Sequence, residues 1–295
     1  MIMYDIAALY EADTIDKAVR LRVEHPQAHI ISGGSDVLVQ IREGRRAGVE
    51  LISLYMINSM RGVTIDSERS IRIGSLTSFS HITAHPLIKR HIPVLGKAVD
   101  MIGGPQVRNI GTIGGNTCNG VTSADSSSTL HAWDAIIELY GSQGIRRVPI
   151  KDFYLKAGVV DIHPDEIQIA VLIPQSSYER TFGHYIKYAM REAMDIATTG
   201  TSVNVRLSPD KRKVERARIA FGVAGPVPLR SPHAEARANN AQLSKDLPLC
   251  FAHEVLKDIR SRDSWRASKP FRQHIAIESA RRAFIESVHA AGGSL

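Results

Sequence analysis

The chain has only two cysteines, Cys118 and Cys250, among 295 residues. Two thiols cannot supply the four ligands of an iron–sulfur cluster, and they form no disulfide framework. No apolar run approaches the roughly 20 residues that span a bilayer. The amino terminus lacks a basic segment ahead of an apolar stretch, so we do not expect a secretory signal there. These absences favour a protein of the reducing cytoplasm that has no membrane span.

Several catalytic and binding signatures are also missing. The sequence has no G-x-S-x-G elbow and no P-loop, and we interpret none of its 12 histidines as a metal ligand. His131, two residues before Trp133, is therefore interpreted as a packing residue. We predict no metal site in this chain and no side chain that acts as a nucleophile.

The charge is positive but dispersed. Lysine and arginine number 37 against 30 acidic residues, which gives a net charge of +7. The basic residues form three separate groups, at 42–46, 211–218 and 260–272, rather than one face or arm. This distribution is typical of a solvated surface and predicts no nucleic-acid partner, while anionic ligands or acidic partner subunits remain compatible with it.

The first half of the chain reads as alternating short elements. Thr14 predicts an N-cap for a helix that runs to about residue 24, and a second helix is expected over 93–102 after a turn at 86–90. Strands are expected at 28–31, 49–54, 70–75, 135–139 and 167–173. The β-loop-β start lacks the G-x-G-x-x-G spacing and the long following helix of a Rossmann unit, which disfavours an ordinary nicotinamide-binding domain.

The second half follows a different order. A polar stretch at 175–181 predicts a domain boundary. Three strands are expected beyond it, at 185–190, 201–207 and 217–223, and two helices follow, over 249–259 and 275–288. Strands followed by helices predict an α+β domain with three strands under a helical layer.

Two glycine pairs, each in a small polar loop, are the main functional signal. The first loop is Ser32-Gly33-Gly34-Ser35-Asp36, and the second is Gly111-Thr112-Ile113-Gly114-Gly115-Asn116-Thr117. Residues without a Cβ let backbone N–H groups approach a bulky anion, and nearby hydroxyls add uncharged donors. Two such loops predict a diphosphate clamp for a dinucleotide. The competing interpretation is a set of tight turns between strands.

Five charged residues near these loops have candidate structural or binding roles. Asp125 accepts hydrogen bonds from a ribose or caps the next helix, and Asp36 is expected to cap the turn that follows the first loop. Lys187 is a cofactor contact or an ordinary surface lysine on a strand. Arg191 and Asp195 are expected to pair and to shape a loop.

At these residues the chain resembles the FAD-binding medium subunits of molybdenum-containing hydroxylases, and within them the bacterial xanthine dehydrogenase branch. The resemblance is carried by residues 31–36, Gln106 to Asn109, residues 111–116, Ser123 to Asp125, Asp165 to Ile167, Lys187, Arg191, Asp195-Ile196 and residues 264–269. It covers essentially the whole chain, and the two glycine loops together make it specific.

The resemblance implies an α+β fold. It comprises a vanillyl-alcohol-oxidase-type (PCMH-like) FAD-binding domain over 1–176, with subdomains of about 1–56 and 57–176. A C-terminal α+β domain over 177–295, with three strands backed by helices, is similar to the C-terminal domain of carbon monoxide dehydrogenase flavoproteins. The implied FAD contacts are Ile30, Ile31, Ser32, Gly33, Gly34, Ser35, Asp36, Val37, Gly111, Thr112, Ile113, Gly114, Gly115, Asn116, Asp125, Ile167 and Lys187.

Two departures from the family pattern bear on this assignment. Ser32 and Ser35 stand where relatives often have alanine and threonine, and both changes are mild. The chain also lacks the cysteine-rich, cluster-binding segment of the hydroxybenzoyl-CoA reductase branch, which disfavours that branch.

The implied function is electron transfer within a multisubunit oxidoreductase. A large subunit with the molybdenum cofactor would hydroxylate a purine, and a small subunit with two 2Fe–2S clusters would pass the electrons to FAD in this chain. The flavin would reduce NAD⁺, with Lys187 and Asp195 near its ring or the adjacent loop. The alternatives are a flavin subunit for nicotinate, aldehyde or carbon monoxide, a stand-alone FAD oxidase, and a non-enzymatic binding or scaffold protein.

Overall fold

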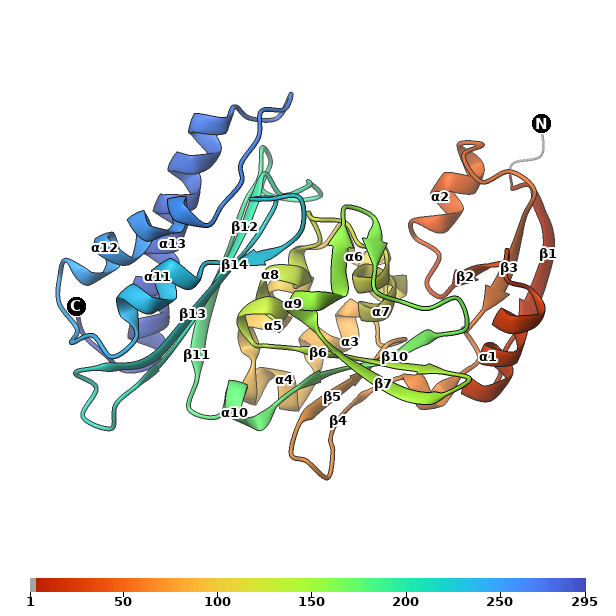
Figure 1. Ribbon diagram of the computed structural model, residues 1–295, viewed down its shortest axis with the longest axis horizontal. Coiled ribbons are helices and arrows are strands. Elements are labelled where there is room, and N and C mark those ends of the chain that lie inside the picture. The colour runs from red at the N-terminus through yellow and green to blue at the C-terminus, as the bar shows by residue number, and fades with distance from the viewer. Residues whose placement is uncertain (1–3) are drawn as a thin grey trace.

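The computed structural model describes residues 4–295. Three blocks follow one another along the long axis of the molecule in Figure 1. A small sheet with two helices carries the amino terminus, a mixed block lies in the middle, and a sheet covered by helices carries the carboxyl terminus.

The amino-terminal block is a three-stranded parallel sheet in the order β1-β3-β2. Its elements are β1 Ile6–Glu11, α1 Ile15–Glu24, β2 His29–Ile31, α2 Val37–Arg42 and β3 Val49–Ser53. Thr14 caps α1 as predicted, because its hydroxyl accepts a hydrogen bond from the Lys17 N–H. The β-loop-β interpretation of this region omitted β1 and the short helix α2. Helix α2 lies in the crossover from β2 to β3, which parallel neighbours require.

The middle block is built on a five-stranded antiparallel sheet in the order β4-β5-β10-β6-β7. The strands are β4 Val63–Ile65, β5 Ile71–Gly74, β6 Ile136–Gly141, β7 Gly144–Pro149 and β10 Ile167–Ile173, with a separate pair, β8 Tyr154–Lys156 and β9 Val159–Val160. The helices are η1 Asn58–Met60, α3 Phe79–Ala84, α4 Pro86–His91, α5 Pro93–Asp100, α6 Pro105–Ile110, α7 Ile113–Cys118, α8 Asp125–Ala132, α9 Ile150–Phe153 and α10 Gln175–Tyr178.

The expected turn at 86–90 is a helix, α4. Pro86 stands at its first position, where a missing N–H costs nothing, and the His85 ring nitrogen Nδ1 accepts a hydrogen bond from the Leu87 N–H. A histidine cap is not a recognised helix start signal in a sequence, so the pattern indicated only a turn.

The carboxyl-terminal block is a four-stranded antiparallel sheet in the order β11-β12-β13-β14, covered on one face by helices. Its elements are β11 Phe182–Tyr188, β12 Thr199–Leu207, β13 Val214–Gly222, β14 Leu229–Arg230, α11 Pro232–Ala238, α12 Leu247–Glu254, η2 Val255–Lys257 and α13 Lys269–Ala290. The three predicted strands and two predicted helices are present, and the two-residue strand β14 and helix α11 extend them.

Helix α8 joins the middle and carboxyl-terminal blocks. All eight of its residues are buried, and it packs on strands β12 and β13. Asn204 of β12 donates a hydrogen bond to the Ala132 carbonyl at 2.6 Å. The helix therefore lies within a continuous interior shared by the two blocks.

Among residues 4–295, no helix is both long and apolar enough to cross a membrane.

Candidate functional site

The two glycine loops lie against each other. A Cβ built on Gly33 would stand 2.1 Å from the carbonyl oxygen of Ile110, the residue that precedes Gly111. The hydroxyl oxygens of Ser32 and Thr112 are 3.1 Å apart, within hydrogen-bonding distance. The fold therefore brings together two segments that are remote in the sequence, and the first glycine of the first loop is required for their contact.

The first loop offers free backbone donors. The loop begins after Ile31, the last residue of β2, whose carbonyl accepts a hydrogen bond from the Leu54 N–H. Gly34 adopts a left-handed φ of +74°, which favours glycine. Within the part of the chain that the structure describes, the N–H groups of residues 33–35 have no protein acceptor. Unpaired N–H groups on a loop without lysine or arginine suit an anionic group that is bound by the backbone.

Asp36 stands at the N-cap position of α2, as expected, but its carboxylate does not cap the backbone. It accepts a hydrogen bond from the Gln40 side chain, one turn along the same helix. Ile30 and Ile31 lie on β2, and Val37 begins α2, so these three predicted site residues flank the loop within regular elements.

The second loop follows helix α6 and is itself mostly the short helix α7, rather than a set of turns between strands. Its N–H groups are already bonded: Ile113 to the Thr77 carbonyl, Gly114 to the Ser75 carbonyl and Gly115 to the Thr112 hydroxyl. These glycines therefore allow close packing. A Cβ on Gly111 would lie 2.7 Å from the Phe79 ring, and one on Gly114 would lie 2.6 Å from the Ser75 Cβ.

Two residues of α7 remain available to a ligand. Gly115 is exposed and Asn116 is half-buried, whereas residues 111–114 are buried. The side-chain oxygen of Asn116 accepts a bond from Ser126 at 2.6 Å, which leaves its amide NH₂ group as the donor. This face of α7 lies beside the first loop, since a Cβ on Gly115 would stand 3.2 Å from the Ser32 hydroxyl oxygen.

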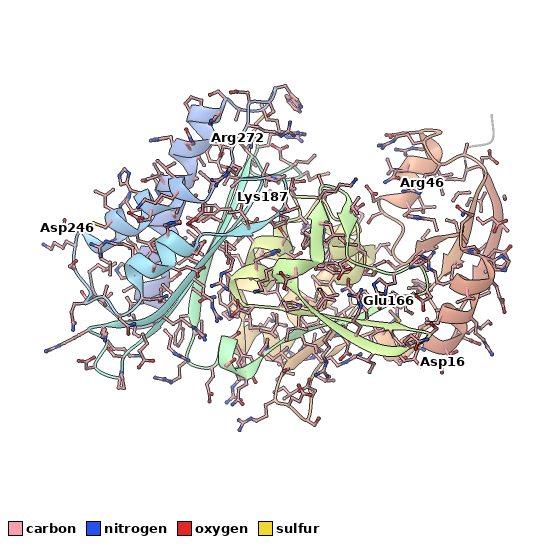
Figure 2. The ribbon with its side chains drawn as sticks, in the orientation of Figure 1. Asp16, Arg46, Glu166, Lys187, Asp246 and Arg272 are labelled. Atoms are coloured by element: carbon pink, nitrogen blue, oxygen red, sulfur yellow. The ribbon has the colours of Figure 1, made fainter. Side chains whose placement is uncertain are left out.

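Asp125 and Lys187 form a buried ion pair between the middle and carboxyl-terminal blocks. The Lys187 Nζ lies 2.7 Å from Asp125 Oδ2, and the exposed fractions of the two side chains are 8% and 7%. The Lys187 side chain points toward the middle block, because it bonds to Asp125 and to the Met101 carbonyl, and Figure 2 labels it near the junction of the two blocks. Lys187 is therefore not a surface lysine, and Asp125, which begins α8 without capping it, is not an N-cap.

The electrostatics of this pair follow from its burial. Burial raises the pKa of Asp125, while the charge of Lys187 and the hydrogen bonds from Lys187 and Tyr185 oppose that rise. Tyr185 donates its hydroxyl to Asp125 Oδ1 at 2.8 Å, and burial raises its own pKa well above the ordinary value. The result is a carboxylate with a donor on each oxygen.

Asp195 and Arg191 shape the loop between β11 and β12, as predicted. The Asp195 carboxylate accepts hydrogen bonds from the N–H groups of Arg191 and Ile196, at 2.9 and 2.8 Å. Burial acts to raise the pKa of Asp195, but these hydrogen bonds outweigh it and leave the pKa lowered. The loop approaches the start of α6 through Met194, whose sulfur would lie 3.7 Å from a Cβ on Gly104.

Ile167, another predicted site residue, lies at the start of β10 and is 2% exposed. It belongs to a core cluster with Ile52 and Leu76. Glu166, labelled in Figure 2, precedes it and is held by two hydrogen bonds from Arg146, at 2.8 and 2.7 Å. In this structure Ile167 is a packing residue.

Sequence reasoning missed two polar residues of this site, Tyr185 and Ser126. Tyr185 lies two positions before Lys187 on the same strand, so the period of two could have placed both side chains on one face. Ser126 follows Asp125 in a serine-rich segment, and no sequence signal pairs it with Asn116.

The arrangement is chemically suited to binding rather than to bond cleavage. It offers unpaired backbone N–H groups, hydroxyls, one buried ammonium group and a paired carboxylate. Among the described residues, no three His, Cys, Asp or Glu side chains gather as a metal site. A dinucleotide cofactor fits these groups, because its diphosphate would accept hydrogen bonds from the unpaired N–H groups of the first loop.

Two family descriptions match consecutive parts of the chain. Residues 4–176 match the family described as FAD binding domain in molybdopterin dehydrogenase. Residues 184–287 match the carbon monoxide dehydrogenase flavoprotein C-terminal domain.

Individual relatives match over nearly the whole length. The chain is 40% identical over 293 residues to the xanthine dehydrogenase FAD-binding subunit of Escherichia coli O157:H7, which covers 99% of this chain and 100% of the relative. It is 29% identical to the nicotinate dehydrogenase FAD-subunit of Eubacterium barkeri, over 80% of this chain and 81% of that one.

A solved structure extends the likeness to three dimensions. A chain of the carbon monoxide dehydrogenase of Hydrogenophaga pseudoflava, in a form that lacks the Mo-pyranopterin moiety, superimposes with a TM-score of 0.91 at 25% identity, and the match covers 99% of both chains.

Proposed function

Because this chain belongs to the FAD-binding subunits of molybdopterin dehydrogenases, we propose that it is the flavin subunit of a xanthine dehydrogenase that uses NAD⁺ as electron acceptor. The predictions of FAD, of the two-part fold and of the family are confirmed by the matches to both family descriptions and by the full-length relatives. The proposal adds the purine substrate, the acceptor and the route of the electrons.

The substrate assignment is carried by one observation, the 40% identity with a xanthine dehydrogenase subunit along the whole chain. The nicotinate dehydrogenase relative is 29% identical over a smaller share of the chain. A stand-alone FAD oxidase and a non-enzymatic scaffold lack comparable support, because the relative covered in full is a subunit of a dehydrogenase.

The chain's own residues would hold and orient the cofactor. We assign the diphosphate to the free N–H groups of residues 33–35 and to the hydroxyls of Ser32 and Thr112. Asn116 would add its amide NH₂ group, and Lys187 would direct a positive charge at the cofactor. FAD, when bound, would accept electrons from 2Fe–2S clusters of a small subunit and deliver them to NAD⁺.

The partners in this proposal are a small subunit with 2Fe–2S clusters and a large subunit with the molybdenum cofactor. The two cysteines of this chain are free thiols, in keeping with the proposed cytoplasmic location. Substrate choice would then reside in the large subunit, outside this chain.

The substrate and acceptor are tested with the assembled complex. The chain is produced together with the partner subunits, and xanthine and nicotinate are each offered with NAD⁺. Reduction of NAD⁺ by xanthine and not by nicotinate is the expected result. Turnover of nicotinate but not of xanthine would contradict the proposed substrate. Turnover of xanthine with an artificial acceptor but not with NAD⁺ would contradict the proposed acceptor.

The FAD site is tested with Gly33→Ala in the full chain. The added Cβ would stand 2.1 Å from the Ile110 carbonyl oxygen, so the two loops must separate and the FAD content should fall to a small fraction of the wild-type value. The measurement is the flavin released per chain.

Gly96→Ala is the matched control. A Cβ at Gly96, in helix α5, would make only ordinary contacts, the nearest at 3.5 Å, so FAD content should not change. Equal FAD content in the two variants would refute the loop contact as part of the site.

A further inference from the structure

Tyr185 is the polar residue of this region that the proposed function leaves without a role. Its side chain is 1% exposed and belongs to the core cluster of the middle block, although the residue lies on β11 of the carboxyl-terminal block. A buried hydroxyl costs free energy unless it is hydrogen-bonded, and this one donates to Asp125 Oδ1 at 2.8 Å. Because burial raises the pKa of Tyr185, the hydroxyl stays protonated and remains a donor.

The hydrogen bonds of Lys187 explain why the orientation of Asp125 matters. An ammonium group has three donors and no acceptor. One donor of Lys187 reaches Asp125 Oδ2 at 2.7 Å, and another reaches the Met101 carbonyl oxygen at 3.0 Å. These two bonds fix the Nζ atom and leave one N–H for a ligand. A rotation of the Asp125 carboxylate would displace the first bond and turn the free N–H with it.

Gly200 provides the space that the Tyr185 hydroxyl occupies. It pairs with Lys187 in the antiparallel register of β11 and β12. A Cβ on Gly200 would lie 3.1 Å from the Tyr185 hydroxyl oxygen, closer than most Cβ contacts in proteins. A side chain at position 200 would therefore require this hydroxyl to shift by a few tenths of an ångström. The glycine therefore serves the geometry of the tyrosine and not a turn, since it lies inside a strand.

We propose that Tyr185, seated against Gly200, is a positioning residue that locks the Asp125 carboxylate and thereby fixes the direction of the free Lys187 N–H toward FAD. Tyr185 itself does not touch the cofactor in this proposal, which rests on the proposed role of Lys187. Tyr185 and Lys187 come from β11, while Asp125 and Met101 come from the middle block, so the network joins the two blocks at the site.

The test uses the full chain with FAD and three variants. Tyr185→Phe keeps the ring and removes only the hydroxyl. Gly200→Ala keeps the hydroxyl but forces it to shift. Tyr188→Phe is the matched control, because Tyr188 lies on the same strand, contacts the Phe271 ring and takes no part in the network. The readouts are the dissociation constant of FAD, from flavin fluorescence, and the midpoint potential of the bound flavin.

We expect Tyr185→Phe and Gly200→Ala each to raise the dissociation constant about tenfold, because the misdirected Lys187 N–H would lose its hydrogen bond to FAD, and a bond from a charged group contributes on that scale. The midpoint potential should fall in both, because a less well-directed ammonium group stabilises the negative, reduced flavin less. Tyr188→Phe should match the wild type in both measurements. A purely structural role for Tyr185 would alter thermal stability but not the potential.

Lys187→Ala separates the failure of this inference from failure of the proposed function. If Lys187→Ala weakens FAD binding while Tyr185→Phe leaves affinity and potential unchanged, the positioning role is wrong and the lysine contact stands. If Lys187→Ala also behaves as the wild type, the lysine contact is wrong and the inference falls with it. A wild-type chain that binds no FAD would overturn the proposed function itself.

Discussion

His131 shows how burial alone fixes the charge of a residue in this protein. It lies on α8, is 1% exposed and bonds through Nδ1 to the Ser127 carbonyl at 2.8 Å, while its Nε2 has no partner in the part of the chain that the structure describes. Burial lowers its pKa from an ordinary value of about 6.5 to about 4. The ring is therefore neutral in the folded protein at neutral pH, and the packing role expected from the sequence agrees with this position.

This pKa difference predicts a loss of stability in acid. Below pH 6.5 the unfolded chain binds a proton that the folded chain does not, so stability falls until the pH reaches the folded pKa of about 4. The loss over this window amounts to about 3 kcal/mol. His131→Gln should flatten the pH dependence of the free energy of unfolding, measured with urea. The exposed His289→Gln should retain the wild-type slope, and an equally steep slope in His131→Gln would disprove the assignment.

At the scale of elements, the N-cap of α7 couples helix stability to the candidate site. Thr112 accepts a hydrogen bond from the Gly115 N–H and also lies 3.1 Å from the Ser32 hydroxyl of the first loop. Thr14 makes the same kind of cap on α1, and no hydrogen bond links it to the glycine loops. The two threonines thus form a natural comparison.

Thr112→Ala and Thr14→Ala should each destabilise the chain by about 1 kcal/mol, the usual cost of a lost N-cap. Only Thr112→Ala should also weaken FAD binding, because it removes the hydroxyl contact between the two loops. Thermal unfolding and a fluorescence titration with FAD measure the two effects. Thr112→Ser should restore both, and weakened FAD binding in Thr14→Ala would argue for a general effect of stability instead.

The elements that the sequence predicted are those with local signals. Thr14, the apolar spacing of 15–24 and the continuous apolar run of β10 carry their own information, and so do the two glycine pairs. The short helices α4 and α7 were missed for two reasons. The cap of α4 is a histidine ring, and the acceptors of the α7 N–H groups, Ser75 and Thr77, are remote in the sequence.

The same limit applies to the site. The sequence indicated that Asp125 and Lys187 matter, through the family resemblance, but each also had an ordinary local explanation as a cap or a surface charge. Only the packing of α8 on the second sheet brings them to 2.7 Å from each other. The roles of the second-loop glycines changed for a similar reason. The Gly114 N–H finds its acceptor at Ser75 in the β5–α3 connection, while the N–H groups of Gly111 and Gly115 bond to Val107 and Thr112.

At the scale of the whole molecule, the close contact between Trp133 and Gly183 packs the middle block against the carboxyl-terminal block. A Cβ on Gly183, in β11, would stand 2.1 Å from the tip of the Trp133 ring. Trp133 is 1% exposed, whereas the other tryptophan, Trp265, is 78% exposed. Tryptophan fluorescence can therefore report on this junction once Trp265 is replaced.

In a Trp265→Phe background, Gly183→Ala should destabilise the chain by about 1–3 kcal/mol, as overpacking of an interior does. The emission of Trp133 should shift to longer wavelength, because the blocks must separate to admit the methyl group. Alanine in place of glycine does not by itself weaken a strand, so any destabilisation would come from the contact with Trp133. An unchanged spectrum and an unchanged unfolding temperature would show that Gly183 and Trp133 are not closely packed.

Helix α8 has a consequence for how such subunits can be recombined. All eight residues of this serine-rich helix are buried, so the helix forms part of the interior of both the middle and the carboxyl-terminal blocks. The halves are therefore not interchangeable parts. A hybrid that joins the first half of this chain to the second half of a relative would need residues on β12 and β13 that pack against α8. Without them, the hybrid would lose both the contact between the blocks and the Asp125–Lys187 ion pair.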